Sequence, residues 1–279
     1  MGRPVVTERM LEELQERGAE IRLPEGAIVT PAARDWLKEN GVALRWGQAG
    51  KATCSVSLAA ALASCRVIDL SKRIEPGKVS GPVGMPARKY EIKPFTFPPG
   101  EIMTEIWMEN HISTHVECPS HFMGPRHGRT GMDVSEVPIE SFFGEAVLID
   151  LAHSRKGEEV LPSLLRTAGA RPGDIVFFGN APHEGKDRPF LGRTVARYLA
   201  DLPAKMIGID DTVFPENPAV LLKELDKYFI HDFLLSKNIP LIEGLTNLSA
   251  LPAKRFIFFG VPAAMGGCDS FPIRAMALV

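Results

Sequence analysis

The chain has 279 residues, of which 45% are hydrophobic and 24% are charged, and its formal net charge is −2. This length suits one large domain, or one domain with an appendage, and the composition is that of a soluble globular protein. The near-neutral charge offers no attraction for nucleic acid or for an anionic membrane, and no apolar run approaches the roughly 18–20 residues that a membrane span requires. The first residues lead into a charged helix and are not a signal peptide, and the four cysteines form no CxxC pair. We therefore expect a cytoplasmic protein without a disulfide framework.

Residues 1–55 are predicted to form a small helical appendage. Thr7 can cap a helix that runs to Gly18, and Thr30 can cap a second helix that has proline at its first position. Residues 56–65 are small and polar with several alanines, so we predict a linker there. The expected role of the appendage is packing or contact between copies of the chain.

The main domain, residues 66–279, is predicted to be α/β with a mixed sheet. Short apolar strands alternate with helices along it, which favours this class. The extended, proline-rich region before residue 110 suggests an additional antiparallel or mixed sheet, and Glu101–Glu109 is predicted to be a strand. Three aromatic residues of this region, Phe95, Phe97 and Trp107, are expected in the core or in a pocket wall. Further strands are predicted at 146–151, 174–178, 206–209, 239–242 and 255–261, and helices at 161–168, 191–202 and 221–230.

The strongest chemical signal is the run HISTHVECPSHF, which begins at His111. His111, His115 and Glu117 are spaced at i, i+4 and i+6, and His121 follows four residues after Glu117. Imidazole and carboxylate are ligands that suit zinc, manganese and iron(II). Pro119 and the poor helix formers between the histidines disfavour a helix, so we expect a strand end that runs into a loop, with both histidines and the carboxylate on one face. His121 is then free to be a ligand or a general base; the alternative for the whole cluster is hydrogen-bonded surface histidines.

Other candidate residues are weaker when each is taken alone. His231 is predicted near a helix end and Glu243 at a strand end, and a single histidine is more often structural than functional. Cys118 is either a nucleophile paired with a nearby histidine or a packed thiol. Arg274 either orients a substrate carboxylate or pairs with Asp269.

Several ordered motifs together resemble the family of metal-dependent cyclase-like hydrolases that includes bacterial kynurenine formamidase and isatin hydrolase. The family signature HxGTHxDxPxHF is similar to HISTHVECPSHF, and the resemblance extends over most of residues 66–279. Further motifs similar to those of the family are DLS at 69–71, GD at 173–174, GID at 208–210, the segments around His231 and Glu243, and the glycine-rich stretch 266–275.

The resemblance implies a swivelling β/β/α fold and a homodimeric or homotetrameric enzyme that acts on a small molecule. It implies one or two divalent ions, zinc or manganese, and His121 as the catalytic histidine. The implied metal ligands are His111, His115 and Glu117, with His231 and Glu243 completing a second site.

Two departures from the family signature bear on the number of ions. Ser113 stands where the signature has glycine, and Glu117 stands where it has aspartate. The extra methylene of Glu117 displaces the carboxylate by about 1.5 Å, one carbon–carbon bond length. That displacement bears on whether the carboxylate bridges two ions or binds one.

The expected function is hydrolysis of a small-molecule amide, formamide or cyclic amide, that is, of a non-peptide C–N bond. Metal-activated water would attack, and His121 would serve as general base and acid. The alternatives are a metal-dependent lactone hydrolase or dehydratase that uses the same site, and a non-catalytic metal-binding scaffold protein that docks through residues 1–55.

Overall fold

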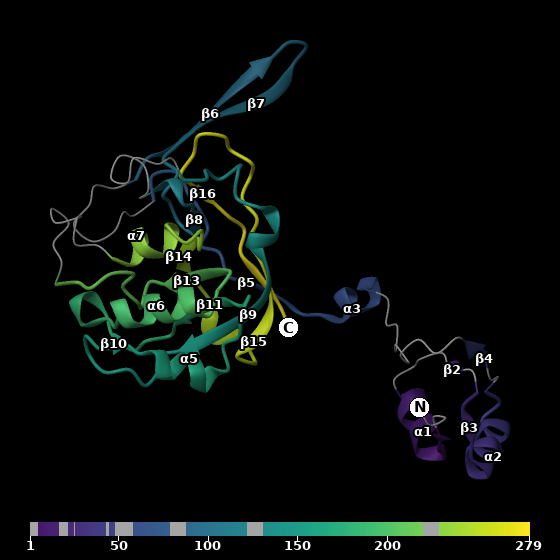
Figure 1. Ribbon diagram of the computed structural model, residues 1–279. Coiled ribbons are helices and arrows are strands. Elements are labelled where there is room, and N and C mark those ends of the chain that lie inside the picture. Colours follow the sequence, from purple (N-terminus) through teal and green to yellow (C-terminus); the bar gives the residue numbers. More distant parts are fainter. Residues whose placement is uncertain are drawn as a thin grey trace. The chain divides into compact units, whose positions relative to one another are not determined.

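The computed structural model (Figure 1) divides into two units, Met1–Cys65 and Arg66–Val279, and each has a hydrophobic core of its own. The residues that it describes are 5–16, 22–24, 26–42, 45–47, 58–78, 88–121, 131–219 and 229–279.

The amino-terminal unit contains short helices and two pairs of parallel strands. Thr30 caps α2 as predicted, because its Oγ1 accepts a hydrogen bond of 3.3 Å from the backbone N–H of Ala33. The segment 56–65, predicted as a linker, contains the helix α3, since its leucine and alanine residues are strong helix formers. The elements are β1 (Val5–Val6), α1 (Glu8–Glu16), β2 (Arg22–Pro24), β3 (Ile28–Val29), α2 (Pro31–Glu39), β4 (Arg45–Gly47) and α3 (Leu58–Ser64).

The second unit is built on a nine-stranded mixed sheet with the strand order β16-β8-β14-β13-β11-β9-β15-β17-β5. The prediction of an α/β domain with a mixed sheet is therefore confirmed. The strands of this sheet are β5 (Val67–Asp69), β8 (His115–Glu117), β9 (Phe143–Asp150), β11 (Ile175–Gly179), β13 (Met206–Asp210), β14 (Leu241–Leu245), β15 (Arg255–Phe259), β16 (Ser270–Pro272) and β17 (Met276–Leu278).

Four neighbouring strands, β9, β11, β13 and β14, run parallel, and helices connect them in sequence. Figure 1 shows these helices together beside the sheet. None of the described helices is long and apolar enough to cross a membrane. The remaining elements of this part are η1 (Ile139–Phe142), β10 (Glu159–Val160), α5 (Pro162–Ala168), η2 (Gly185–Asp187), β12 (Phe190–Leu191), α6 (Arg193–Asp201), α7 (Ile230–Leu235) and η4 (Leu248–Ala250).

Apolar residues cover both faces of the central strands. Ala146 and Ile175 belong to one buried cluster, whereas the next residues along their strands, Val147 and Val176, belong to the cluster that includes the helices. Parallel strands buried on both faces have nearly continuous apolar sequences, which is why these segments were recognisable as strands.

Two predicted element ends were wrong. Residues 220–228, which hold most of the helix predicted at 221–230, lie outside the described residues. His231 was expected near the end of a helix, but α7 begins at Ile230, so His231 lies at the start of one. Glu243 lies in the middle of β14, because that strand continues to Leu245 with hydrogen-bonded neighbours on both sides.

The extended region before residue 110 forms a separate antiparallel hairpin of β6 (Tyr90–Phe97) and β7 (Glu101–Met108), as the sequence suggested. Figure 1 shows it projecting away from the nine-stranded sheet. The expectation that its aromatic residues lie in a core or pocket wall was wrong. Phe95, Phe97 and Trp107 are exposed, because the hairpin pairs with no other strand in the described part of the chain.

Candidate metal centre

The candidate site forms where β8 pairs with β14. These antiparallel strands place His115 directly opposite Glu243, with Glu117 further along β8. His231 belongs to α7, on the face of the sheet covered by the helices. The predicted face at period 2 holds for His115 and Glu117 only, because β8 begins at His115. His111 lies in the bend before it.

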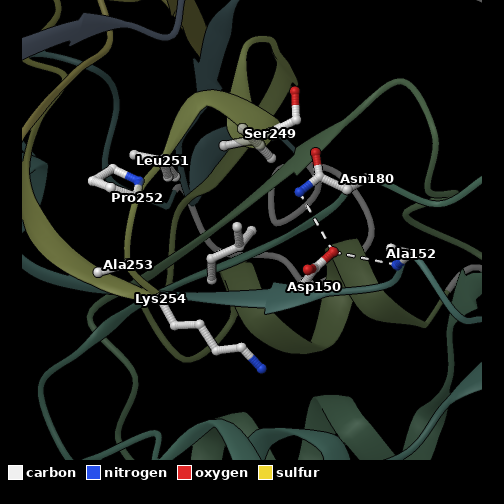
Figure 2. Close-up of a pocket in the computed structure, with 10 residues that line it drawn as sticks. Asp150, Ala152, Asn180, Ser249, Leu251, Pro252, Ala253 and Lys254 are labelled. Atoms are coloured by element: carbon white, nitrogen blue, oxygen red, sulfur yellow. Dashed lines mark hydrogen bonds between the residues drawn. The ribbon is translucent and has the colours of Figure 1, made fainter.

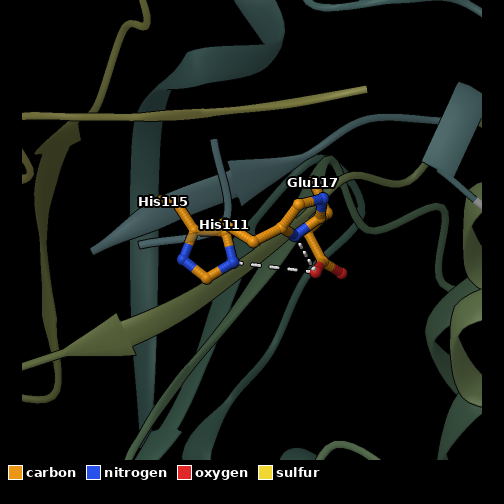
Figure 3. Close-up of side chains that lie close together, drawn as sticks. All are labelled: His111, His115 and Glu117. Carbon is orange, nitrogen blue, oxygen red and sulfur yellow. Dashed lines mark hydrogen bonds and ion pairs between the residues drawn. The ribbon is translucent and has the colours of Figure 1, made fainter. Parts of the chain in front are cut away.

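The carboxylate of Glu117 is surrounded by imidazole rings. Its Oε1 lies 3.0 Å from Nδ1 of His111 and 3.6 Å from Nε2 of both His115 and His121, while its Oε2 lies 3.3 Å from Nε2 of His231. Figure 3 shows how His111 and His115 converge on this carboxylate. Glu117, His115 and His231 are buried, so these contacts are shielded from water. The structure thus brings the histidines of the run together with His231.

The predicted ligands form two groups that share Glu117. His111, His115 and Glu117 offer ligand atoms within 4.8 Å of one another, and so do Glu117, His231 and Glu243. In the second group Nε2 of His231 lies 3.6 Å from Oε1 of Glu243. All five predicted ligands therefore lie in one cluster, assembled from segments far apart in the sequence.

Hydrogen bonds fix which nitrogen of His115 faces the cluster. Its Nδ1 lies 3.1 Å from the carbonyl oxygen of Ser113, so Nδ1 carries the proton and donates, and Nε2 presents a lone pair. Nε2 of His115 and Oε2 of Glu117 are buried, and neither has a hydrogen-bond partner among the described residues. Leaving such atoms unpaired is costly, and a divalent cation would satisfy both. The donor set therefore fits a metal ion.

Ser113 itself adopts the left-handed conformation, with φ of +56°. This conformation suits the glycine of the family signature, and the serine side chain partly compensates by donating a 2.8 Å hydrogen bond to the carbonyl of Lys72. The carbonyl of Ser113 would lie only 2.4 Å from a Cβ at Gly244, so the close backbone approach at this site depends on Gly244.

Glu216 forms hydrogen bonds to His231 on the Nδ1 side of the ring, and this residue was not predicted from the sequence. Its Oε1 accepts hydrogen bonds of 2.9 Å from both the backbone N–H and Nδ1 of His231, and its Oε2 accepts one from the backbone N–H of Phe229 at 3.1 Å. This buried carboxylate orients Nε2 of His231 towards Glu117, an arrangement common behind metal-binding histidines. Its only sequence signal is an acidic residue in a proline-flanked turn.

Asp269 holds the other end of the cluster. Its Oδ2 lies 2.7 Å from Nδ1 of His121 and 3.1 Å from Nε2 of His111. The pairing of β16 with β8 places Ser270 opposite Glu117, which brings the preceding Asp269 next to the histidines. Its carboxylate accepts a hydrogen bond from Nδ1–H of His121, and Nε2 of His121 faces Glu117.

Of the two interpretations offered for Arg274, the pairing with Asp269 was wrong. Its guanidinium forms a paired contact with Asp69, with Nε to Oδ1 at 3.0 Å and Nη2 to Oδ2 at 2.6 Å. The strand after Arg274, β17, pairs with β5, which places Asp69 opposite Met276. Arg274 therefore pairs with Asp69 and not with the predicted Asp269, because β17 pairs with β5.

The carboxylates of the cluster favour the protonated forms of His111 and His231. Burial lowers the pKa of His111, but hydrogen bonds to Asp269 and Glu117 outweigh burial and raise this pKa to about 9. Burial likewise disfavours charged His231, yet Glu117, Glu216 and Glu243 raise its pKa well above the ordinary value. Burial raises the pKa of Glu117, but its close contacts with His111, His115 and His231 outweigh burial and hold this pKa well below its usual range. A cation that binds here must displace protons.

Cys118 is a packed thiol. It is fully buried in the hydrophobic core, and burial, together with nearby carboxylates, raises its pKa to about 12. A thiol with so high a pKa stays protonated at neutral pH and is a poor nucleophile. Of the two interpretations, this favours the structural one.

The chain matches the model of the Cyclase family over residues 68–214, which is more than half of its length. It belongs to the Cyclase family. Among related proteins, this Cyclase-family chain is 26% identical to cyclase-like protein 1 of Oryza sativa subsp. japonica, over 90% of its own length and 95% of that protein. It is also 26% identical to an uncharacterized protein of Methanocaldococcus jannaschii, over 64% of its own length and 84% of that protein.

Solved structures share the fold of this Cyclase-family chain. Isatin hydrolase A from Labrenzia aggregata, bound to benzyl benzoate, superposes with a TM-score of 0.64 at 20% identity, covering 80% of this chain and 96% of that one. A potential metal-dependent hydrolase with cyclase activity superposes with a TM-score of 0.58 at 24% identity, covering 77% of this chain and 98% of that one. At these identities the likeness establishes the fold.

A groove of about 480 Å³ elsewhere on this Cyclase-family chain is separate from the candidate metal centre (Figure 2). Asp150 and Lys254 are among its lining residues, and none of the clustered histidines or carboxylates lines it. Oδ1 of Asp150 accepts hydrogen bonds from Ala152 at 3.2 Å and Asn180 at 3.5 Å, so it is engaged within the groove wall itself. The groove and the histidine cluster therefore share none of their side chains.

Glu216→Gln is expected to weaken metal binding by this Cyclase-family chain about 10–100-fold, the usual loss for a partner that orients a ligand. The amide lacks the charge that polarises His231. Its NH2 group also replaces one carboxylate oxygen and cannot accept a hydrogen bond. Titration of the metal-loaded protein with a competing chelator measures the change. Glu184→Gln, at an exposed position outside the cluster, is the matched control, and unchanged affinity in Glu216→Gln would refute the role.

Proposed function

We propose that this chain is a metal-dependent hydrolase of small-molecule amides, formamides or cyclic amides. The observation that carries the proposal is the convergence of two ligand groups on Glu117, together with the burial of Nε2 of His115 and Oε2 of Glu117, neither of which has a hydrogen-bond partner among the described residues. Membership of the Cyclase family and a fold shared with isatin hydrolase support the same chemistry.

The ligand types support zinc or manganese, held by His111, His115 and Glu117 on one side and by Glu117, His231 and Glu243 on the other. Oε1 of Glu117 faces His111 and His115, whereas Oε2 faces His231. One oxygen for each group favours two ions that share this carboxylate, in spite of its extra methylene. Divalent ions held there would acidify a water molecule and polarise the substrate carbonyl.

His121 has the geometry of a general base and acid. Asp269 holds its Nδ1, and its Nε2 lies 3.6 Å from Oε1 of Glu117, so this nitrogen points into the site. In this proposal Nε2 takes a proton from the attacking water and returns it to the departing nitrogen. The carbonyl carbon gains the oxygen of water as its bond to nitrogen breaks. Cys118, which is buried and protonated, takes no part.

Metal analysis of the purified protein, followed by a substrate screen, tests the proposed function. We expect turnover of N-formyl amines or cyclic imides that is lost with a chelator and restored by zinc or manganese. Faster turnover of lactones, or loss of water from a hydroxylated substrate, would instead assign a lactone hydrolase or a dehydratase. Tight metal binding with no turnover of any class would identify a scaffold protein and refute the proposal.

A further inference from the structure

The guanidinium of Arg188 is held in one orientation by its neighbours. Its Nε donates a 3.0 Å hydrogen bond to the carbonyl of Gly185, and its Nη1 donates one of 2.6 Å to the carbonyl of Asp211. The group also lies over the ring of Phe214, 3.7 Å from the ring centroid. Stacking on an aromatic ring and two hydrogen bonds together fix the plane of the guanidinium before any ligand arrives.

Most of the hydrogen-bonding capacity of Arg188 is unused. A guanidinium has five N–H donors, and Arg188 uses two of them, while its Nη2 has no partner among the described residues. The nearby buried carboxylate of Asp210 accepts its hydrogen bonds from Asn180 and Thr212 instead. A half-buried guanidinium with a free edge matches a carboxylate, which accepts two parallel hydrogen bonds from it.

The chain segment that contacts Arg188 also orients a metal ligand. Asp211 and Phe214 of this segment contact Arg188, and Glu216, two residues further on, accepts hydrogen bonds from the backbone and the ring of His231. This short segment therefore joins the Arg188 guanidinium to the candidate metal centre.

Glu243, a candidate ligand, is within electrostatic range of Arg188. Its strand, β14, pairs with β13, and Asp211 directly follows β13. Burial lowers the pKa of Arg188, while nearby carboxylates that include Asp211 and Glu243 oppose this shift. A small substrate whose amide lies at the metal centre can therefore extend to this guanidinium.

Lys72 provides a second cation beside Asp211. Its Nζ forms an ion pair with the carboxylate of Asp211, whose backbone carbonyl accepts the hydrogen bond from Arg188. The same Nζ lies 3.5 Å from the point where a Cβ of Gly244 would stand, next to Glu243 in the sequence. Two cations thus share one aspartate, and this group of three side chains keeps a net positive charge that attracts an anion.

We propose that Arg188 binds a carboxylate of the substrate, so that the preferred substrates are amides that carry an acid group near the bond to be cleaved. This inference rests on the proposed function and specifies the substrate class of the same site. A paired contact with a guanidinium of fixed orientation would place the amide towards the metal ligands. Lys72 would strengthen the attraction, but a single ammonium does not orient a carboxylate in this way.

Substrate pairs that differ only in charge test this role in the zinc-loaded full chain. The probes are N-formyl amino acids, each compared with its own carboxamide. We expect a higher kcat/KM for the acids in the wild type. In Arg188→Gln the ratio of kcat/KM for acid over amide should fall roughly 10–100-fold, the usual loss for hydrogen bonds to a charged group. Arg188→Lys keeps the charge without the planar fork and should recover only part of the ratio.

The ratio separates recognition of the acid from a structural role of Arg188. A disturbed fold or a lower metal content changes kcat/KM for acid and amide together and leaves their ratio unchanged. Arg166→Gln is the matched control, because Arg166 is an exposed arginine over the ring of Tyr198, 5.5 Å from its centroid, and it should keep the wild-type ratio. An unchanged ratio in folded Arg188→Gln would overturn the inference.

Calorimetric binding of the same pairs makes the test independent of turnover. The wild type should bind the acids more tightly than the amides, and Arg188→Gln should lose this preference by a similar factor. Absence of a preference for acids in the wild type would overturn the inference, even in an enzyme that hydrolyses neutral amides. Preferred binding of acids that depends on Arg188, without turnover of any pair, would keep the carboxylate site and refute the proposed function.

Discussion

Glu117→Gln is expected to remove metal from both ligand groups and to lower kcat/KM for any accepted substrate more than ~100-fold. Even partners that only orient a ligand cost 10–100-fold, and Glu117 supplies one oxygen to each group. The neutral amide is a poor ligand, and it cannot balance the charge of the cations or of the surrounding histidines. Elemental analysis after dialysis gives the metal content, and steady-state kinetics give the loss of turnover.

Two further variants separate one ion from two. Glu243→Gln touches only the second group, so it should halve the metal content if two ions share Glu117. Glu117→Asp restores the carboxylate of the family signature and should keep metal bound. Full metal content in Glu117→Gln would contradict the assignment of Glu117 as a shared ligand, and unchanged metal content in Glu243→Gln would argue for a single ion.

His121→Ala should lower kcat about 10²–10⁴-fold, the usual contribution of a general acid–base group, while metal content stays at the wild-type level. The reason is geometric, since Nε2 of His121 faces the ligands while Asp269 holds its Nδ1. The separation of activity from metal content distinguishes a proton-transfer role from a ligand role. Kinetics and metal analysis on the same preparation provide both values.

His183→Ala is the matched control for this histidine. Nε2 of His183 lies 2.8 Å from the carbonyl of Ser154, away from the cluster, so its loss should leave kcat/KM within about twofold, as expected for a position off the reaction path. If His121→Ala turned over every accepted substrate at nearly the wild-type rate, the base assignment would be wrong. Loss of metal from His121→Ala would instead make His121 a ligand.

Much of the fold was predictable because its signals are local. The buried strands β9, β11, β13 and β15 are near-continuous apolar runs, and α5 and α6 lie within the helices predicted at 161–168 and 191–202. The predicted strand at Glu101–Glu109 corresponds to β7 within one residue. Whether an apolar strand is covered depends on its neighbours, however, so the exposure of Trp107 was missed. Periodicity records which residues share a face and not what lies against that face.

By itself, the sequence determined the α/β class and the metal-binding character of the run from His111 to His121, because spacing and ligand chemistry are properties of a short segment. Only the tertiary structure decided which carboxylates form hydrogen bonds to the histidines. Asp269 reaches His121 because β16 pairs with β8, and Oε1 of Glu216 lies 2.9 Å from Nδ1 of His231. Such contacts depend on long-range strand pairing and packing, whose register is set by the whole sheet and leaves no mark in local spacing.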